Sequence, residues 1–166
     1  MVRVSIDSLA LGSMPGLSIM TLRPVDDDPA GGRVLPICIG NVEAASIAMA
    51  LGNSRTARPM THSLLANVMA QLGGTLEKVV IDKVRGTVFY ATLYVDRCGT
   101  VHKVDARPSD AVAVAVRLKR PIFVESAVLE SASFPSWVNA QREQDKAAIA
   151  EFHEFVDGLS PEDFLE

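Results

Sequence analysis

Two acids and an arginine lie within the short stretch from Asp105 to Asp110, and their types suit chemistry on a phosphate group. Arg107 can bind a phosphate through two parallel hydrogen bonds, and the two carboxylates can hold a divalent cation or accept a proton. Pro108 suits the first position of a helix and forces Arg107 into an extended conformation. The stretch is therefore predicted to join a strand to a helix, and the free N–H groups of a helix N-terminus favour an anion.

Three further side chains with suitable chemistry, Glu43, Arg58 and His62, lie beside predicted helix starts. Glu43 is the one charge in an apolar segment, although an acid in the first turn also simply favours the helix dipole. His62 can act as a base or an acid near neutral pH, while a lone histidine at a helix start is more often a surface or hydrogen-bonded residue. Arg58 is a second cation that can bind phosphate.

These residue types fit the hydrolysis of a phosphodiester, which needs an activated water, a charge that stabilises the phosphorane and a proton for the leaving oxygen. Carboxylates can activate the water by holding Mg²⁺ or Mn²⁺. We therefore predict a site with catalytic Glu43, His62, Asp105 and Asp110, phosphate-binding Arg58 and Arg107, and Glu43, Asp105 and Asp110 as candidate metal ligands.

The same charges also allow a purely structural interpretation. Asp105 and Arg107 can form an ion pair that ties the strand to the helix, and Glu43 can form a partly buried bridge with Arg58. Asp110 can serve only the helix dipole. Networks of this kind occur in many proteins that are not enzymes.

The elements that must position these residues follow from hydrophobic periodicity and turn residues. Strands are predicted at 2–11, 17–23, 34–39, 76–84, 87–96, 100–104 and 122–125. Helices are predicted at 41–51, 62–72 and 109–119, with a short helix or turn ending near 130.

Burial can also be predicted for three parts of the chain. The segment 41–51 is apolar nearly all round, which predicts a largely buried helix. The apolar residues of 62–72 recur at helical spacing, which predicts a core-facing stripe. Cys38 and Cys98 sit singly among apolar residues, as reduced core thiols do.

The composition of this 166-residue chain predicts one domain that stays in the cytoplasm. No apolar run reaches the ~18 residues that a membrane span needs, and the alternating N-terminus is unlike a secretory signal.

Residues 140–166 hold eight acids and two bases, whereas the rest of the chain has a formal charge of +2. We expect a linker and an acidic amphipathic helix in 131–166, with a surface suited to a protein partner. Because the remainder is nearly neutral, nucleic-acid binding should be weak or confined to a cleft.

Five phrases of the sequence, in order and at matching spacing, resemble the bifunctional nuclease domain family over residues 1 to about 130. They are Leu35-Pro36-Ile37 with Ile39-Gly40 and Glu43-Ala44, Arg58-Pro59 with Thr61-His62, Gly86-Thr87 with Phe89-Tyr90-Ala91, Asp105-Ala106-Arg107-Pro108-Ser109-Asp110-Ala111, and Pro121-Ile122 with Val124. Ser160-Pro161-Glu162-Asp163-Phe164 is similar to a C-terminal extension of some bacterial members. Family members commonly carry an acid after the Thr-His pair, where this chain has Ser63.

The resemblance implies an α+β fold, with a mixed, mainly antiparallel sheet packed with several helices in a single domain of residues 1–130. It also implies a homo-oligomer and a nuclease that acts on both DNA and RNA. Two alternatives remain: a non-catalytic oligomeric module that binds protein or small ligands, and an enzyme with another substrate.

Overall fold

The alternating and apolar stretches of the sequence form eight strands and four helices in the part of the chain that the structure describes. That structure is a computed structural model, and it describes residues 1–11, 16–25, 32–54 and 56–135. The strands are β1 Val2–Leu11, β2 Leu17–Pro24, β3 Arg33–Gly40, β4 Gly74–Arg85, β5 Val88–Arg97, β6 Thr100–Ala106, β7 Ile122–Val124 and β8 Phe134–Pro135. The helices are α1 Asn41–Leu51, α2 Thr61–Gln71, α3 Pro108–Arg117 and α4 Ser126–Ala132. The predicted α+β fold is confirmed.

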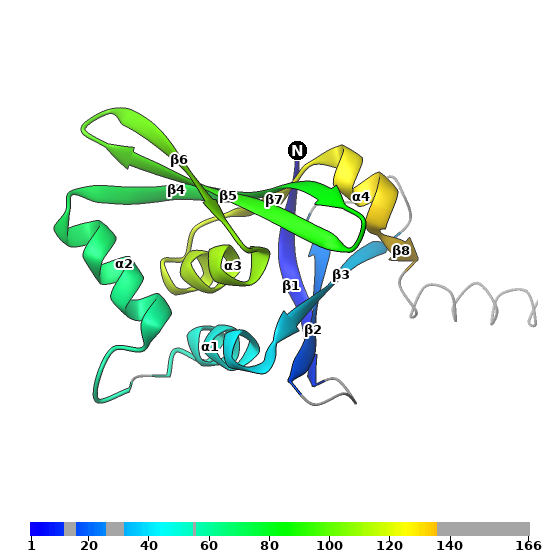
Figure 1. Ribbon diagram of the computed structural model, residues 1–166, viewed down its shortest axis with the longest axis horizontal. Helices are drawn as coiled ribbons and strands as arrows, with labels where there is room; N and C mark the ends of the chain where they lie inside the picture. Colours follow the sequence, from blue (N-terminus) through cyan, green and yellow to red (C-terminus); the bar gives the residue numbers. More distant parts are fainter. Residues whose placement is uncertain (12–15, 26–31, 55, 136–166) are drawn as a thin grey trace, which may run out of the picture.

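All eight strands belong to one sheet with the order β6-β5-β4-β7-β1-β2-β3-β8. Neighbouring strands are antiparallel except for β4 and β7, which are parallel. The sheet bends between β7 and β1, so that β4 to β7 form one limb and β1 to β3 the other (Figure 1). Helices α1 and α3 lie in the angle between the limbs, while α2 lies beside the far end of β4.

Small side chains allow α1 and α3 to pack closely against each other and against the sheet. Every residue from Ala111 to Ala115 of α3 is buried, as are Ala44, Ile47 and Ala50 of α1. Pro108 is the first residue of α3, as the sequence predicts. The buried helices therefore fix the position of the first turns of α1 and α3, where the acids lie.

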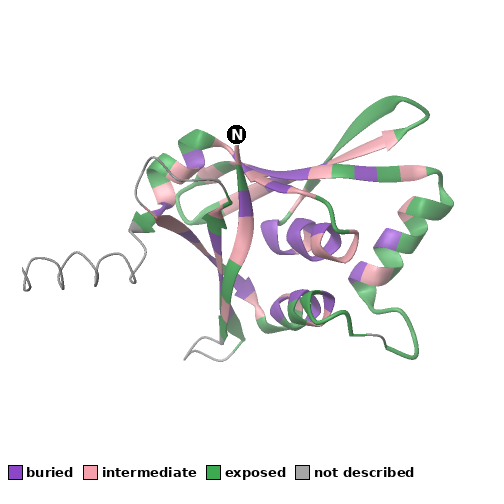
Figure 2. Ribbon diagram, turned by 180° about the vertical axis from the view of Figure 1, so that it is seen from behind, coloured by how far each residue is buried: buried purple, intermediate pink, exposed green. Residues whose placement is uncertain are grey.

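The three predictions about burial are wrong. Only one face of α1 is buried, and Val42 is 73% exposed. The apolar stripe of α2 does not lie in the core, since only His62 and Ala66 of that helix are buried (Figure 2). Cys38 and Cys98 are both exposed free thiols, because Cys38 points away from the core and Cys98 occupies a turn with a positive φ of 53°.

Helix α4 and the short strand β8, which pairs with β3, follow β7. From residue 136 onward the predicted acidic helix falls outside the described residues, as do residues 26–31 with their three acids. None of the four described helices has the length and hydropathy that a membrane crossing requires.

Candidate functional site

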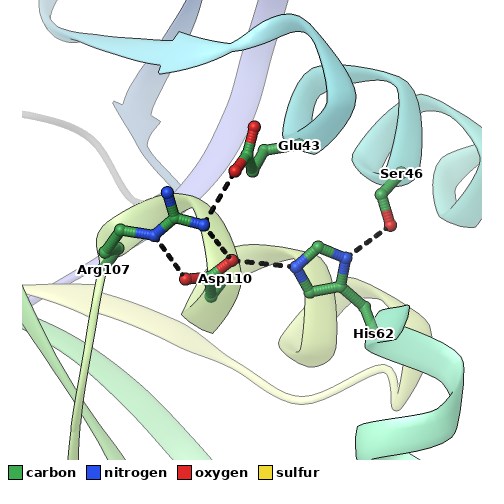
Figure 3. Close-up of polar contacts among 5 residues, drawn as sticks. All are labelled: Glu43, Ser46, His62, Arg107 and Asp110. Carbon is green, nitrogen blue, oxygen red and sulfur yellow. Dashed lines mark hydrogen bonds and ion pairs between the residues drawn. The ribbon is translucent and has the colours of Figure 1, made fainter.

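Four of the six predicted site residues meet where the first turns of α1, α2 and α3 come together (Figure 3). Arg107 lies at the centre of this arrangement. Its Nε donates to Oδ2 of Asp110 at 2.7 Å, and its Nη2 donates to Oδ1 of Asp110 at 3.0 Å and to Oε1 of Glu43 at 2.7 Å. His62 contacts the other side of Asp110. With Ser46, these residues are called the Arg107 cluster below.

Both ring nitrogens of His62 have partners inside the protein. Nε2 lies 3.0 Å from Oδ1 of Asp110, and Nδ1 lies 2.8 Å from Oγ of Ser46. Because ionised Asp110 only accepts hydrogen bonds, Nε2 is the donor to it, and the Ser46 hydroxyl can donate to Nδ1. These two contacts orient the imidazole without an acid at position 63, where this chain departs from the family pattern.

Ser46 is the member of the cluster that sequence reasoning missed. The available signal was the one polar residue that follows the first turn of the alanine-rich helix α1, three positions after Glu43. The contacts connect a serine, a histidine and an aspartate, as in the triads of serine hydrolases. However, Ser46 is only 4% exposed, so its hydroxyl anchors the histidine and is not positioned to attack a substrate.

Local sequence explains how the charged side chains reach each other. Arg107 is the N-cap of α3 with an extended backbone (φ −69°, ψ 146°), as expected for a residue before proline. Gly40 precedes α1, and a Cβ built on it would lie 2.2 Å from Oε2 of Glu43. Gly40 has an ordinary φ of −71°, so the position of the Glu43 carboxylate, rather than the backbone conformation, disfavours a side chain here.

The electrostatics of the cluster favour its ionised form. Partial burial alone would raise the pKa of Asp110, but the hydrogen bonds from Arg107 and His62 outweigh burial and lower it. The hydrogen bonds to Asp110 and Glu43 raise the pKa of Arg107 further above its ordinary value. The two carboxylates and the guanidinium together have a formal charge of −1.

Asp105 and Arg58 do not join the cluster. Asp105 lies on β6 and lines a neighbouring groove, without forming the expected ion pair with Arg107. Arg58 is exposed, and the expected bridge from Glu43 to Arg58 is replaced by the bridge from Glu43 to Arg107. The catalytic and phosphate-binding roles of all six residues stay predictions.

The predicted Mg²⁺ or Mn²⁺ site does not fit the arrangement of these side chains. Glu43 and Asp110 both bind Arg107, so a divalent cation between them would have to displace the guanidinium. Within the described ranges, no group of three or more His, Cys, Asp or Glu side chains could hold a metal ion.

A groove of about 720 Å³ opens beside the cluster, between α2, α3 and the β5–β6 hairpin. His62, Asp105, Arg107 and Asp110 lie among its lining residues. Its walls are mainly aliphatic, from Leu65, Val68 and Met69 of α2, Leu72 directly after that helix, and Leu93, Val95 and Val104 of the hairpin. The apolar stripe of α2 therefore forms one wall of this groove. The cluster thus borders a space large enough for a small organic ligand.

Comparisons with known proteins agree with the resemblance read from the sequence. A family model described as the bifunctional nuclease domain matches residues 20–136. A protein of Mycobacterium tuberculosis described as uncharacterized is 43% identical over 139 residues, which cover 81% of this chain and 82% of that protein. Bifunctional nuclease 1 and bifunctional nuclease 2 of Arabidopsis thaliana are 29% and 26% identical over 96 and 116 residues. These matches cover 56% and 68% of this chain but only 30% and 35% of the plant proteins.

Proposed function

The chain belongs to the bifunctional nuclease domain family, and from this premise we propose that it hydrolyses phosphodiester bonds of DNA or RNA at the Arg107 cluster. The observation that carries the proposal is the meeting of Glu43, His62, Arg107 and Asp110 beside the groove. These residues come from three of the phrases through which the sequence resembles the family.

Arg107 is the residue that receives the phosphate in this proposal. Its side chain is 66% exposed, and its Nη1 makes no hydrogen bond to any described residue. The Nη1 hydrogens can therefore bind a phosphate oxygen while Nε and Nη2 keep their carboxylate partners. A guanidinium fixed on two sides loses little freedom on binding, and its charge stabilises the phosphorane.

Glu43 is the general base. Its Oε1 accepts from Arg107, whereas Oε2 makes no hydrogen bond to a described residue and can accept a proton from water. The water oxygen forms a bond to phosphorus, the bond to the leaving oxygen breaks, and that oxygen takes a proton from solvent. His62 and Ser46 are positioning residues, because they hold Asp110 and through it Arg107.

The charge of the cluster limits how tightly it can hold nucleic acid. A phosphate about 4 Å from one uncompensated negative charge loses about 1 to 4 kcal/mol, for effective dielectric constants between those of water and a protein surface. Substrate binding should therefore be weak and should depend on contacts in the groove.

The first experiment measures cleavage of labelled single-stranded RNA and DNA by the purified full chain. Glu43→Gln should lower kcat by about 10² or more, the usual contribution of a general base. The matched control is Glu130→Gln on α4, which removes an exposed carboxylate that belongs neither to the cluster nor to the lining of the groove and should leave kcat within a factor of about three. Equal cleavage by wild type and Glu43→Gln would point to a contaminating nuclease and overturn the proposal.

A second arm of the experiment tests the metal hypothesis. Because none of the proposed roles uses a metal, EDTA should leave the rate unchanged. Loss of cleavage on chelation, with recovery on addition of Mn²⁺, would mean that a metal replaces Arg107 between the two carboxylates.

A non-catalytic binding module is the second candidate function, and the character of the groove favours it. Its walls are aliphatic and partly exposed, and the ion pairs beside it resemble a structural network. Such a module would bind a ligand or a second protein at the groove without turnover.

A further inference from the structure

A second cavity, of about 330 Å³, lies at the opposite ends of α1 and α3 from the Arg107 cluster. It is lined by Met49, Ala50, Asn53 and Ser54 from the end of α1, and by Arg117 and Lys119 from the end of α3. Since the first turns of the two helices also meet, at Arg107, the helices run parallel. We call this cavity the C-terminal pocket.

The C-terminal pocket is cationic. Among the described residues that line it, the charged ones are Arg117 and Lys119, and none is an acid. Neither cation forms an ion pair with another residue in the described ranges. Moreover, Nε of Arg117 is buried and has no hydrogen-bond partner among the described residues. A buried donor without an acceptor costs about 1 to 3 kcal/mol, so the guanidinium gains from an incoming acceptor.

The negative ends of the helix dipoles of α1 and α3 do not neutralise both Arg117 and Lys119. The C-terminal ends of α1 and α3 together have a charge of about −1, against +2 from the side chains. In addition, backbone N–H groups already satisfy late carbonyls of both helices: Ser54 N–H donates to Met49 O, and Arg120 N–H donates to Ala115 O. A positive charge therefore remains in the pocket.

We propose that the C-terminal pocket binds the phosphate group of a small anion. Arg117 supplies a planar pair of donors, Lys119 adds a charge, and the Asn53 amide and the Ser54 hydroxyl can donate further hydrogen bonds. Because no described residue holds Nε of Arg117, the guanidinium can turn toward the anion without losing a hydrogen bond at that atom. This site is independent of the proposed nuclease activity.

The test follows the Nε–H signal of Arg117 in ¹H–¹⁵N spectra of the full chain, assigned with Arg117→Gln. Inorganic phosphate, titrated at neutral pH, should shift this signal in a saturable way at millimolar concentration or below. Sodium chloride at the same ionic strength should not, since it only screens charge. A 5′-nucleoside monophosphate is titrated in parallel. Tighter binding of the nucleotide at the same signal would identify a nucleotide as the source of the phosphate, and equal binding would identify free phosphate.

The decisive variant is Lys119→Gly. Lys119 has a positive φ of 54° at the end of α3, where glycine is the preferred residue, so this variant should fold at least as stably as wild type. Loss of the charge should weaken phosphate binding about tenfold or more. Arg120→Gln removes an exposed neighbouring cation that does not line the pocket, and it should bind as wild type does. No saturable shift with either anion, or equal affinity in wild type and Lys119→Gly, would overturn the proposal.

Discussion

At the scale of single residues, the sequence predicts the contacts of the Arg107 cluster between residues close in the chain, but not those between residues far apart in the chain. Pro108 dictates an extended Arg107 at the start of α3, and Asp110 follows three positions later, within reach of the guanidinium. The bond from Arg107 to Glu43 spans 64 positions, and spacing in the chain says nothing about it. The sequence also left Arg58 open as a partner of Glu43, whereas the structure pairs Glu43 with Arg107.

Gly40 provides a test of the cluster that changes none of its polar atoms. Gly40→Ala should displace the Glu43 carboxylate, because the new Cβ would lie 2.2 Å from Oε2, and the bond to Arg107 should break. The loss of this half-exposed contact should lower the free energy of unfolding, measured in urea, by about 1 kcal/mol. It should also lower the kcat of cleavage, as Glu43→Gln does. Gly52→Ala is the matched control at the other end of α1. Gly52 has an ordinary φ of −75°, and the Cβ added there would lie 3.5 Å from its nearest atoms, which is an ordinary van der Waals contact. Equal effects of the two variants would contradict this explanation of Gly40.

Asp110 should give the protein a characteristic dependence of stability on pH. Its pKa is lowered in the folded state, so the ionised carboxylate stabilises the fold above the ordinary carboxyl pKa of about 4, and this contribution disappears as the pH falls through the folded value. Asp110→Asn should therefore reduce the free energy of unfolding by about 1 to 3 kcal/mol at pH 7, and by progressively less below pH ~4. Urea titrations of both proteins from pH 7 to pH 2.5 measure this difference. A difference that does not change with pH would show that the carboxylate charge is not responsible.

At the scale of elements, helical periodicity reveals an apolar face but not what covers it. The stripe on α2 has the spacing of a core helix, yet Leu65, Val68 and Leu72 are 47%, 45% and 65% exposed. The reason lies in the fold: α3 fills the angle of the sheet, and α2 can bury only its His62 and Ala66 side. The spacing of the apolar residues therefore predicts that this face of α2 lies in the core, and only the tertiary structure shows that it does not.

The parallel arrangement of α1 and α3 explains why their two ends differ in charge. Glu43 and Asp110 lie at the two positive dipole ends, where carboxylates are stabilised, and Arg107 lies between them. Arg117 and Lys119 both lie at the negative end of α3, whereas α1 has no base in its last turn. The sequence predicts each of these placements for one helix at a time. The packing of the two parallel helices is needed to bring Glu43 of α1 beside Asp110 of α3, while the two cations are already close together at the end of α3.

At the scale of the whole molecule, the sequence predicts the hairpins but not the order of the sheet. The turn at Arg85-Gly86 identifies β4 and β5 as neighbours, because the pairing is local. The insertion of β7 between β4 and β1 joins strands that lie far apart in the chain. Hydrophobic patterns do not encode that choice of partner, and it is this insertion that unites the two limbs around α1 and α3.

The order of the sheet leaves β6 at an edge, and the predicted homo-oligomer has its best candidate interface there. Among the described strands β6 pairs only with β5, and Val104 of β6 stands 49% exposed on the wall of the groove. Opposite it lie the exposed Leu65 and Val68 of α2 and Leu72 directly after that helix. An unpaired edge beside exposed aliphatic side chains favours association of two copies about a twofold axis.

Val104→Lys should therefore shift the full chain from dimer toward monomer in sedimentation velocity measured over a range of concentrations, because a buried lysine without a partner opposes association. The matched control is Val88→Lys at the start of β5, where the valine is 54% exposed and lies outside the groove. That variant should sediment as wild type does. If wild type sediments as a monomer at all concentrations, the edge of β6 is not an interface between copies, and the exposed wall of the groove is then left to a ligand, as the binding-module function requires.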